Sequence, residues 1–221
     1  SDLNESYRVP WLFDEESVDV LRKFTKLKCT LMPYLFDAAV TASQQGTPMM
    51  RPMVLDFHHD PATHTLDRQY MFGDSLLVAP IFNEQGEASY YVPAGKWTNL
   101  LTNEVVEGGR WVQETFDYMN LPLLAKPGSL IAFGNEDSKP DYDYASGTQL
   151  HLFELEAGQT AHTQIVTMDG QSAGDVTATR TDDTIEITIT GAIQNCSVVL
   201  RGISSISSTN GGTATSSEYG Q

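Results

Sequence analysis

Positive charge is scarce in this chain of 221 residues. Lys and Arg number 13 against 29 Asp and Glu, which gives a formal net charge of −16 at pH 7. Nucleic-acid phosphates and anionic membrane surfaces repel a protein of this charge. The composition therefore argues against nucleic acid as a partner and favours a neutral or small ligand.

Long apolar runs are also missing. No stretch approaches the roughly 18 uninterrupted apolar residues of a membrane span, because Lys28 and Asp37 interrupt the most apolar helix-like region. We therefore expect no membrane association. Apolar residues still form 40% of the chain, and its length exceeds that of a usual single domain, which predicts two compact units or one unit plus part of another.

Cysteine is limited to Cys29 and Cys196. The two lie far apart in the sequence and in different predicted units, so a disulfide stays open but is not the default expectation. We predict two buried free thiols.

Familiar catalytic and metal-binding motifs are absent. The chain has no Gly-x-Ser-x-Gly, no glycine-rich phosphate loop and no Cys/His pair with a convincing base. His58, His59, Asp60 and His64 form the one cluster that resembles metal ligands. Adjacent histidines point in different directions on an extended chain, and neither Cys-x-x-Cys nor His-Glu-x-x-His accompanies them. We predict no metal site and no cofactor.

Three aspartates, Asp56, Asp67 and Asp74, are candidates for the paired carboxylates that cleave glycosidic bonds. Asp56 lies in a predicted strand, and Asp67 adjoins Arg68, with which it can pair. Asp74 follows a glycine at a turn. These contexts favour structural roles, so we predict no catalytic residue in this chain.

The rings of Trp11, Trp97 and Trp111 could stack on sugar faces. Aromatic residues of β domains more often fill the core, and we predict that role for these three.

The clearest helical segment runs from Asp14, a suitable N-cap, to Gln45, with Gly46 at its exit. Pro33 lies inside this segment and removes the hydrogen bond to the carbonyl of Cys29, which predicts a kink or two abutting helices. Apolar residues recur every three or four positions in one stripe that needs a partner surface: Val20, Phe24, Leu27, Leu31, Leu35, Ala38 and Ala42.

Downstream of Gly46 the sequence is typical of antiparallel β-sandwiches, with short strand-like runs between turn residues. The candidate strands are 49–57, 75–81, 88–92, 97–99, 105–107, 111–114, 129–132 and, by strict alternation, 184–190. The polar segment 135–141 predicts a domain boundary near Gly134. The Ser/Thr/Gly-rich tail 204–221 is either a frayed end or a partly missing last strand.

The first residues, 1–6, are polar and lack an initiator Met. They resemble neither a signal peptide nor a domain start, and we infer a chain cut from something longer. Asn4 and Asn195 each begin an N-glycosylation pattern and are predicted to carry glycans if the chain is secreted.

Several strings, in order, resemble glycoside hydrolase family 31. They are LMPYL at 31–35, GTPMMRP at 46–52, QYMFGDSLLVAP at 69–80 and PAGKW at 93–97. Further strings are similar to the α-xylosidase branch of that family. They are YRVPW at 7–11, LDRQYM at 66–71, GNED at 134–137 and PDY at 140–142.

The resemblance implies a mainly β chain: residues 1–45 would close a catalytic (β/α)8 barrel, 46–134 would form a proximal β-sandwich domain and 135–221 a distal one. It implies a retaining, exo-acting α-xylosidase that releases α-linked xylose from xyloglucan-type oligosaccharides. Both catalytic aspartates would lie upstream, on a longer partner chain that also binds the substrate. A secreted glycoprotein is expected, and a homo-oligomer of the complete enzyme stays open.

Two alternatives stay open. One is an α-glucosidase of the same family, since the pocket that chooses between xylose and glucose would lie upstream. The other is a non-catalytic β module that binds carbohydrate, although such a module has no use for a long amphipathic helix at its edge.

Overall fold

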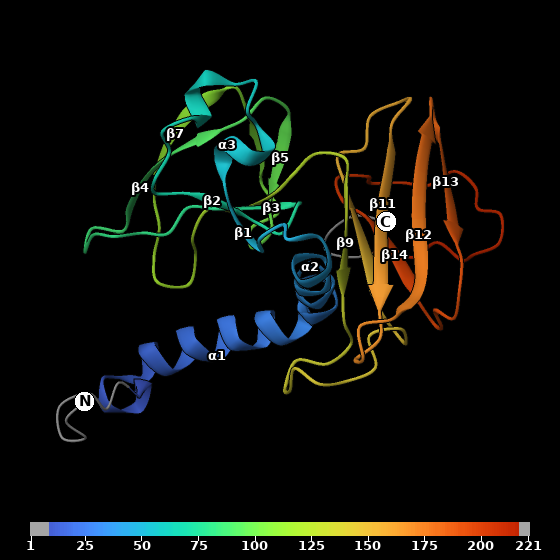
Figure 1. The fold of residues 1–221 in the computed structure, drawn as a ribbon, viewed down its shortest axis with the longest axis horizontal. Coiled ribbons are helices and arrows are strands. Elements are labelled where there is room, and N and C mark those ends of the chain that lie inside the picture. Colours follow the sequence, from blue (N-terminus) through green and yellow to red (C-terminus); the bar gives the residue numbers. More distant parts are fainter. Residues whose placement is uncertain (1–8, 217–221) are drawn as a thin grey trace.

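The computed structural model describes residues 9–216 and is mainly β, with two long helices near its start (Figure 1). The helical elements are η1 (Pro10–Leu12), α1 (Glu15–Thr30), α2 (Met32–Gln45), α3 (Met53–Asp56) and η2 (Pro61–Thr63). The first eight strands are β1 (Met50–Pro52), β2 (Tyr70–Phe72), β3 (Leu76–Val78), β4 (Glu87–Val92), β5 (Lys96–Asn99), β6 (Val105–Glu107), β7 (Arg110–Thr115) and β8 (Leu123–Ala125). The others are β9 (Ser129–Phe133), β10 (Gln149–Phe153), β11 (Thr160–Val166), β12 (Ser172–Thr181), β13 (Thr184–Ile189) and β14 (Ser197–Leu200).

The predicted helix is confirmed as two helices that abut at Leu31. The side chain of Asp14 accepts a hydrogen bond from the backbone N–H of Ser17 (2.7 Å) at the start of α1. Pro33 lies in the first turn of α2, where its missing N–H is tolerated. Gly46 ends α2 in the left-handed region with φ of 76°.

Carbonyl groups freed at this break are bonded by residues from much later in the chain. The hydroxyl of Tyr142 donates to the carbonyl oxygen of Cys29 (2.7 Å), and the backbone N–H of Gly134 donates to that of Thr30 (2.7 Å). Helix ends leave such carbonyls without intrahelical partners. The break therefore anchors the segment that follows β9.

Strands β1–β8, the first β region, form a six-stranded antiparallel sheet in the order β1-β2-β3-β8-β5-β6 and a two-stranded ribbon of β4 and β7. Trp97, Tyr90, Met53 and Met71 fill the core between them. The single strand expected over 49–57 is wrong: β1 ends at Pro52, which lacks the N–H that would extend the ladder, and α3 follows.

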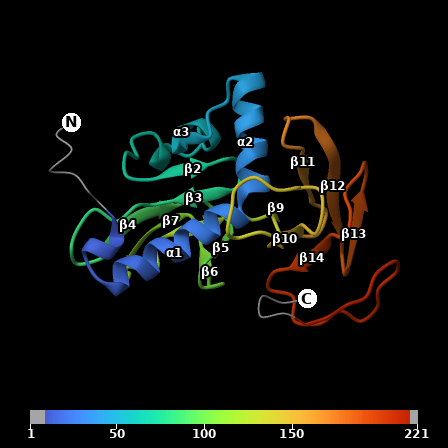
Figure 2. The ribbon, with the colours of Figure 1, turned by 90° about the horizontal axis from the view of Figure 1, so that it is seen from below.

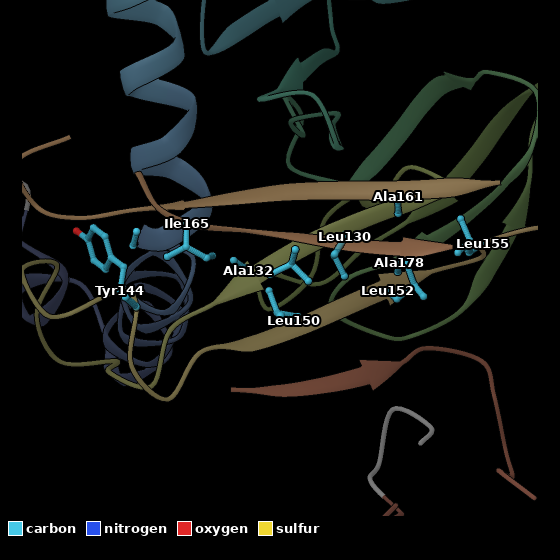
Figure 3. Close-up of a cluster of buried hydrophobic side chains, with 12 residues drawn as sticks. Leu130, Ala132, Tyr144, Leu150, Leu152, Leu155, Ala161, Ile165 and Ala178 are labelled. Atoms are coloured by element: carbon cyan, nitrogen blue, oxygen red, sulfur yellow. The ribbon is translucent and has the colours of Figure 1, made fainter. Parts of the chain in front are cut away.

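Strands β9–β14, the second β region, form two three-stranded sheets, β14-β10-β9 and β11-β12-β13. All their pairs are antiparallel except β10 with β14. The side chains of Leu130, Leu150, Leu152 and Ile165 project between these sheets into a shared core (Figure 3). The predicted division at Gly134 passes between β9 and β10, which are hydrogen-bonded neighbours.

Helix α2 lies between the two β regions (Figures 1 and 2). Tyr34 and Leu35 of α2, with Leu31 just before the helix, share a core with strands of both regions. On another side, the ring of Phe36 packs against Tyr144 of the second region with centroids 5.7 Å apart. Burial on several sides makes α2 the junction of the molecule.

Both cysteines are free, as predicted. Cys29 is buried at the end of α1, whereas Cys196 is only half-buried before β14. The expectation of burial is therefore correct for the first thiol and wrong for the second, because Cys196 lies at the edge of its sheet's core.

Candidate functional site

Large exposed apolar side chains are grouped at the start of the described chain. Four side chains form what we call the N-terminal apolar surface: Trp11, Leu12, Phe13 and Leu21, which are 70%, 62%, 69% and 51% exposed. Of the 16 residues of α1, Cys29 is the one that is buried. Figure 1 shows α1 running away from α2 toward the N-terminus.

The apolar stripe predicted from the sequence meets a partner within the chain over its second half. Leu31, Leu35 and Ala38 are buried, whereas Val20 and Phe24 are only half-buried. Sequence reasoning missed the N-terminal apolar surface, because Trp11, Leu12 and Phe13 precede the helix and Leu21 lies off the stripe. A turn of three consecutive large apolar residues before an N-cap was the signal.

Polar contacts hold α1 to the rest of the chain. The ammonium group of Lys23 donates to the backbone carbonyl of Met119 (2.7 Å), and that of Lys26 lies 2.8 Å from the carboxylate of Asp137. The second pair is exposed, and exposed ion pairs contribute little to stability. The orientation of α1 therefore depends on few strong contacts within the described chain.

The three candidate aspartates do not form a catalytic pair. The carboxylate of Asp56 lies 3.5 Å from the guanidinium of Arg51, a structural ion pair. Asp67 is exposed, and Asp74 accepts a hydrogen bond from the hydroxyl of Ser75 at the β2–β3 turn (2.8 Å). Each lies in its own local setting.

The histidine cluster has local structural contacts. Asp60 caps η2 through the backbone N–H of Ala62 (3.0 Å) and accepts a hydrogen bond from the Tyr91 hydroxyl (2.7 Å). His64 Nε2 lies 2.9 Å from the carbonyl oxygen of His58. Among residues 9–216, no three His, Cys, Asp or Glu side chains are grouped as metal ligands.

The three tryptophans differ in burial. Trp97 is fully buried and donates from Nε1 to the carbonyl of Pro93 (2.8 Å), so its predicted core role is confirmed. The same prediction is wrong for Trp11, and for Trp111, which stands on the outer face of the β4–β7 ribbon with one edge against Tyr91. Strand alternation turns Trp111 away from the core side occupied by Val112.

A buried polar cluster joins the two β regions. Arg201 donates from Nε to Nδ1 of His151 (3.0 Å) and from Nη1 to the side-chain oxygen of Asn103 (2.8 Å). Its guanidinium also lies over the ring of Phe153. Burial, followed by the nearby Arg201 charge, lowers the pKa of His151 to about 3, so this imidazole is neutral.

A polar cavity of about 240 Å³ lies where α2, the β2–β3 turn and β11 meet. Its polar lining includes Asp37, Thr41, Asp74, His162 and Gln164. Burial, then the nearby Asp74 carboxylate, raises the pKa of Asp37 to about 6. Sequence reasoning did not identify Asp37 as a special residue, because its neighbours come from distant segments.

One predicted glycosylation site can be placed. Asn195 is exposed in the turn before β14, with φ of 50°. Asn4 lies outside the described residues. Glycosylation at both stays a prediction.

Two family models match separate segments of the chain. Residues 46–131 match the family model described as "Glycosyl hydrolase family 31 C-terminal domain". Residues 143–221 match the model described as "Alpha-xylosidase YicI, C-terminal domain".

Relatives cover most of this chain. It is 39% identical over 192 residues to alpha-xylosidase XylQ of Lactiplantibacillus pentosus, covering 85% of this chain and 25% of XylQ. It is 29% identical over 164 residues to alpha-glucosidase 2 of Bacillus thermoamyloliquefaciens, covering 74% of this chain and 21% of that protein. The chain therefore spans about a quarter or less of the curated relatives it matches.

The fold also occurs in solved structures. The GH31 dextranase of Flavobacterium johnsoniae, in complex with glucose, superposes with a TM-score of 0.72 at 26% identity. That superposition covers 81% of this chain and 23% of the dextranase.

Proposed function

Because this chain belongs to glycoside hydrolase family 31, we propose that it is the C-terminal part of a retaining, exo-acting α-xylosidase that releases α-linked xylose from xyloglucan-type oligosaccharides. The match of residues 143–221 to an α-xylosidase C-terminal domain carries the choice of substrate. The 39% identity to XylQ supports it. The catalytic aspartates would lie in the upstream part of the enzyme or on a partner chain.

The part that this chain plays would be structural support. We expect the N-terminal apolar surface and α1 to pack on the catalytic barrel as its closing segment. A large apolar side chain is worth about 1.5–3 kcal/mol when it passes from full exposure to full burial, and these four are already partly covered, so burying the rest would contribute roughly 4–8 kcal/mol. That is comparable with the whole stability of a typical domain.

A second candidate, an α-glucosidase, is favoured by the resemblance to alpha-glucosidase 2. The complete enzyme assayed on an aryl α-xyloside and the matching aryl α-glucoside separates the two. We expect the xyloside to have the higher kcat/KM. A higher value for the glucoside would replace the first candidate with the second.

The same assay on the 221-residue chain alone is expected to give no turnover of either substrate. The reason is that its aspartates form no acid and nucleophile pair. Hydrolysis by the isolated chain, verified by intact mass, would disprove the supporting role.

We further propose that the enzyme is secreted and that Asn4 and Asn195 carry glycans. Protein from its natural source should lose mass on enzymatic deglycosylation. Asn195→Gln should remove one glycan's mass. An unchanged mass for the wild-type protein would count against both sites.

A further inference from the structure

Helix α2 and the hairpin of β11 and β12 meet at the polar cavity with an unusual balance of charge. Asp37 is the one charged residue of α2, and it faces Asp74 of the β2–β3 turn and His162 of β11. Asp175 of β12 lies 2.9 Å from His162 Nε2 and also acts on Asp37. Asp37 is therefore close enough to two other carboxylates and one imidazole to feel their charges.

His162 favours the ionised form of Asp37, but the other neighbouring cations and hydroxyls do not offset the negative charge. The ammonium of Lys126 donates to the backbone carbonyl of Asp74 (2.6 Å), not to a carboxylate. Arg51 pairs with Asp56. Tyr34 stays a neutral phenol, because burial raises its pKa, and its hydroxyl donates to the carbonyl of Phe72 (2.6 Å).

β9 contributes only the apolar Leu130 to the lining. Asp37, for which the described residues provide no hydrogen-bond donor, is therefore a half-buried carboxylate among like charges. Desolvation and like charges both disfavour its ionised form.

We propose that this cavity is a pH-responsive contact, in which protonation of Asp37 in mildly acidic solution tightens the docking of the β11–β12 hairpin onto α2, and its ionisation loosens it. Neutral Asp37 removes one of the three negative charges. Ionised Asp37 repels Asp74 and Asp175 across the contact. The hairpin and the helix are therefore held less tightly at a pH where Asp37 is ionised than at a pH where it is protonated.

The direction follows from proton linkage. The pKa of Asp37 is about 6 in the folded chain, against the ordinary value of 3.8 that applies when the chain is unfolded. Between these values the folded state binds the extra proton, so stability falls as pH rises through this window. The loss of stability caused by ionised Asp37 is fully present above about pH 7 and absent below about pH 4.

Asp37→Asn in the full 221-residue chain tests the proposal, because the amide has the shape of the neutral acid and cannot ionise. We expect its Tm to exceed the wild-type value by about 2 °C or more at pH 7.5 and by much less at pH 4, where the destabilisation has nearly vanished. Asp67→Asn, at an exposed carboxylate of the first β region, should show no such pH-dependent difference. A Tm difference that is the same at both pH values, or a lower Tm of Asp37→Asn at pH 7.5, would overturn the proposal.

Amide hydrogen exchange locates the effect. At pH 7.5 the amides of β11 should exchange at least about threefold more slowly in Asp37→Asn than in the wild type, and most of this difference should be lost at pH 4. If Asp37→Asn fails to fold, Asp74→Asn removes a charge from the other side of the cavity. It should also stabilise the chain at pH 7.5, and no stabilisation by either variant would contradict the mechanism.

Discussion

His151 shows how a single buried residue makes the chain sensitive to acid. It is neutral, accepts a hydrogen bond from Arg201 and lies beside Phe133 and Phe153. Because its pKa is lowered from 6.5 to about 3, the unfolded chain binds a proton that the folded chain excludes. The contribution of neutral His151 to folding stability is therefore fully present above about pH 6.5 and is lost as pH falls toward 3.

His151→Asn should remove this dependence while keeping a side-chain acceptor for Arg201. We expect the variant to be less stable than the wild type at pH 7.5, because it loses ring packing. Between pH 7 and pH 5 the wild type should lose about 1–2 kcal/mol more than the variant does. Urea denaturation across this pH range measures the unfolding free energies, with His59→Asn at an exposed site as the control. If stability fell in parallel with pH in the wild type and in His151→Asn, His151 would not be the source of the acid sensitivity.

Gly73 is a position where backbone and packing both require glycine. Its φ is 67°, and a Cβ there would lie 2.2 Å from the hydroxyl oxygen of Tyr34. Gly109 has a similar φ of 76° with open space around it. Gly109→Ala should cost roughly 1–2 kcal/mol through backbone strain alone, and Gly73→Ala clearly more. Thermal unfolding compares them, and equal losses would show that Tyr34 moves aside freely.

Among the elements, those with a strong local signal could be predicted from the sequence. Pro33 alone indicates the break between α1 and α2, and the alternation of 184–190 indicates β13. β8 could not be found this way, because all three of its residues are buried and show no alternation. α3 was missed since Met53 lies in a β-like run, and its position is decided by the core around Trp97.

The candidate sites follow the same division. The turn that holds Asp74 could be predicted from its local context, whereas the ion pair of Asp56 with Arg51 could not. The cavity around Asp37 and the His151–Arg201 contact could not, because their members are up to 138 and 50 positions apart in the chain and meet only through tertiary packing. Long-range electrostatics of this kind has no sequence period.

The break between the helices gives a test at the scale of elements. Tyr142→Phe removes the hydroxyl that bonds the Cys29 carbonyl and leaves the ring in place. The lost hydrogen bond should cost about 0.5–1.5 kcal/mol of unfolding free energy. Tyr118→Phe, at a tyrosine that is 69% exposed, is the matched control and should change little. If both variants lost the same amount, the bond at the break would not matter for stability.

At the scale of the whole molecule, the two β regions and α2 share buried cores. η1 and the first turns of α1 instead leave large apolar side chains exposed. The last prediction concerns this difference. Leu21→Glu places a charge in the N-terminal apolar surface, at a residue that is 51% exposed in this chain. The isolated chain should tolerate it within about 0.5 kcal/mol, since surface substitutions rarely do more.

Association with the upstream part of the enzyme should respond differently. If the catalytic barrel covers this surface, Leu21→Glu buries an unpaired charge, and the two parts should separate in size-exclusion chromatography while the wild-type parts elute together. Val105→Glu, at a residue of β6 that is 50% exposed, should leave the complex intact. Equal behaviour of the two variants would place the contact with the barrel elsewhere, because a charge buried at an interface cannot be as harmless as one that stays in water.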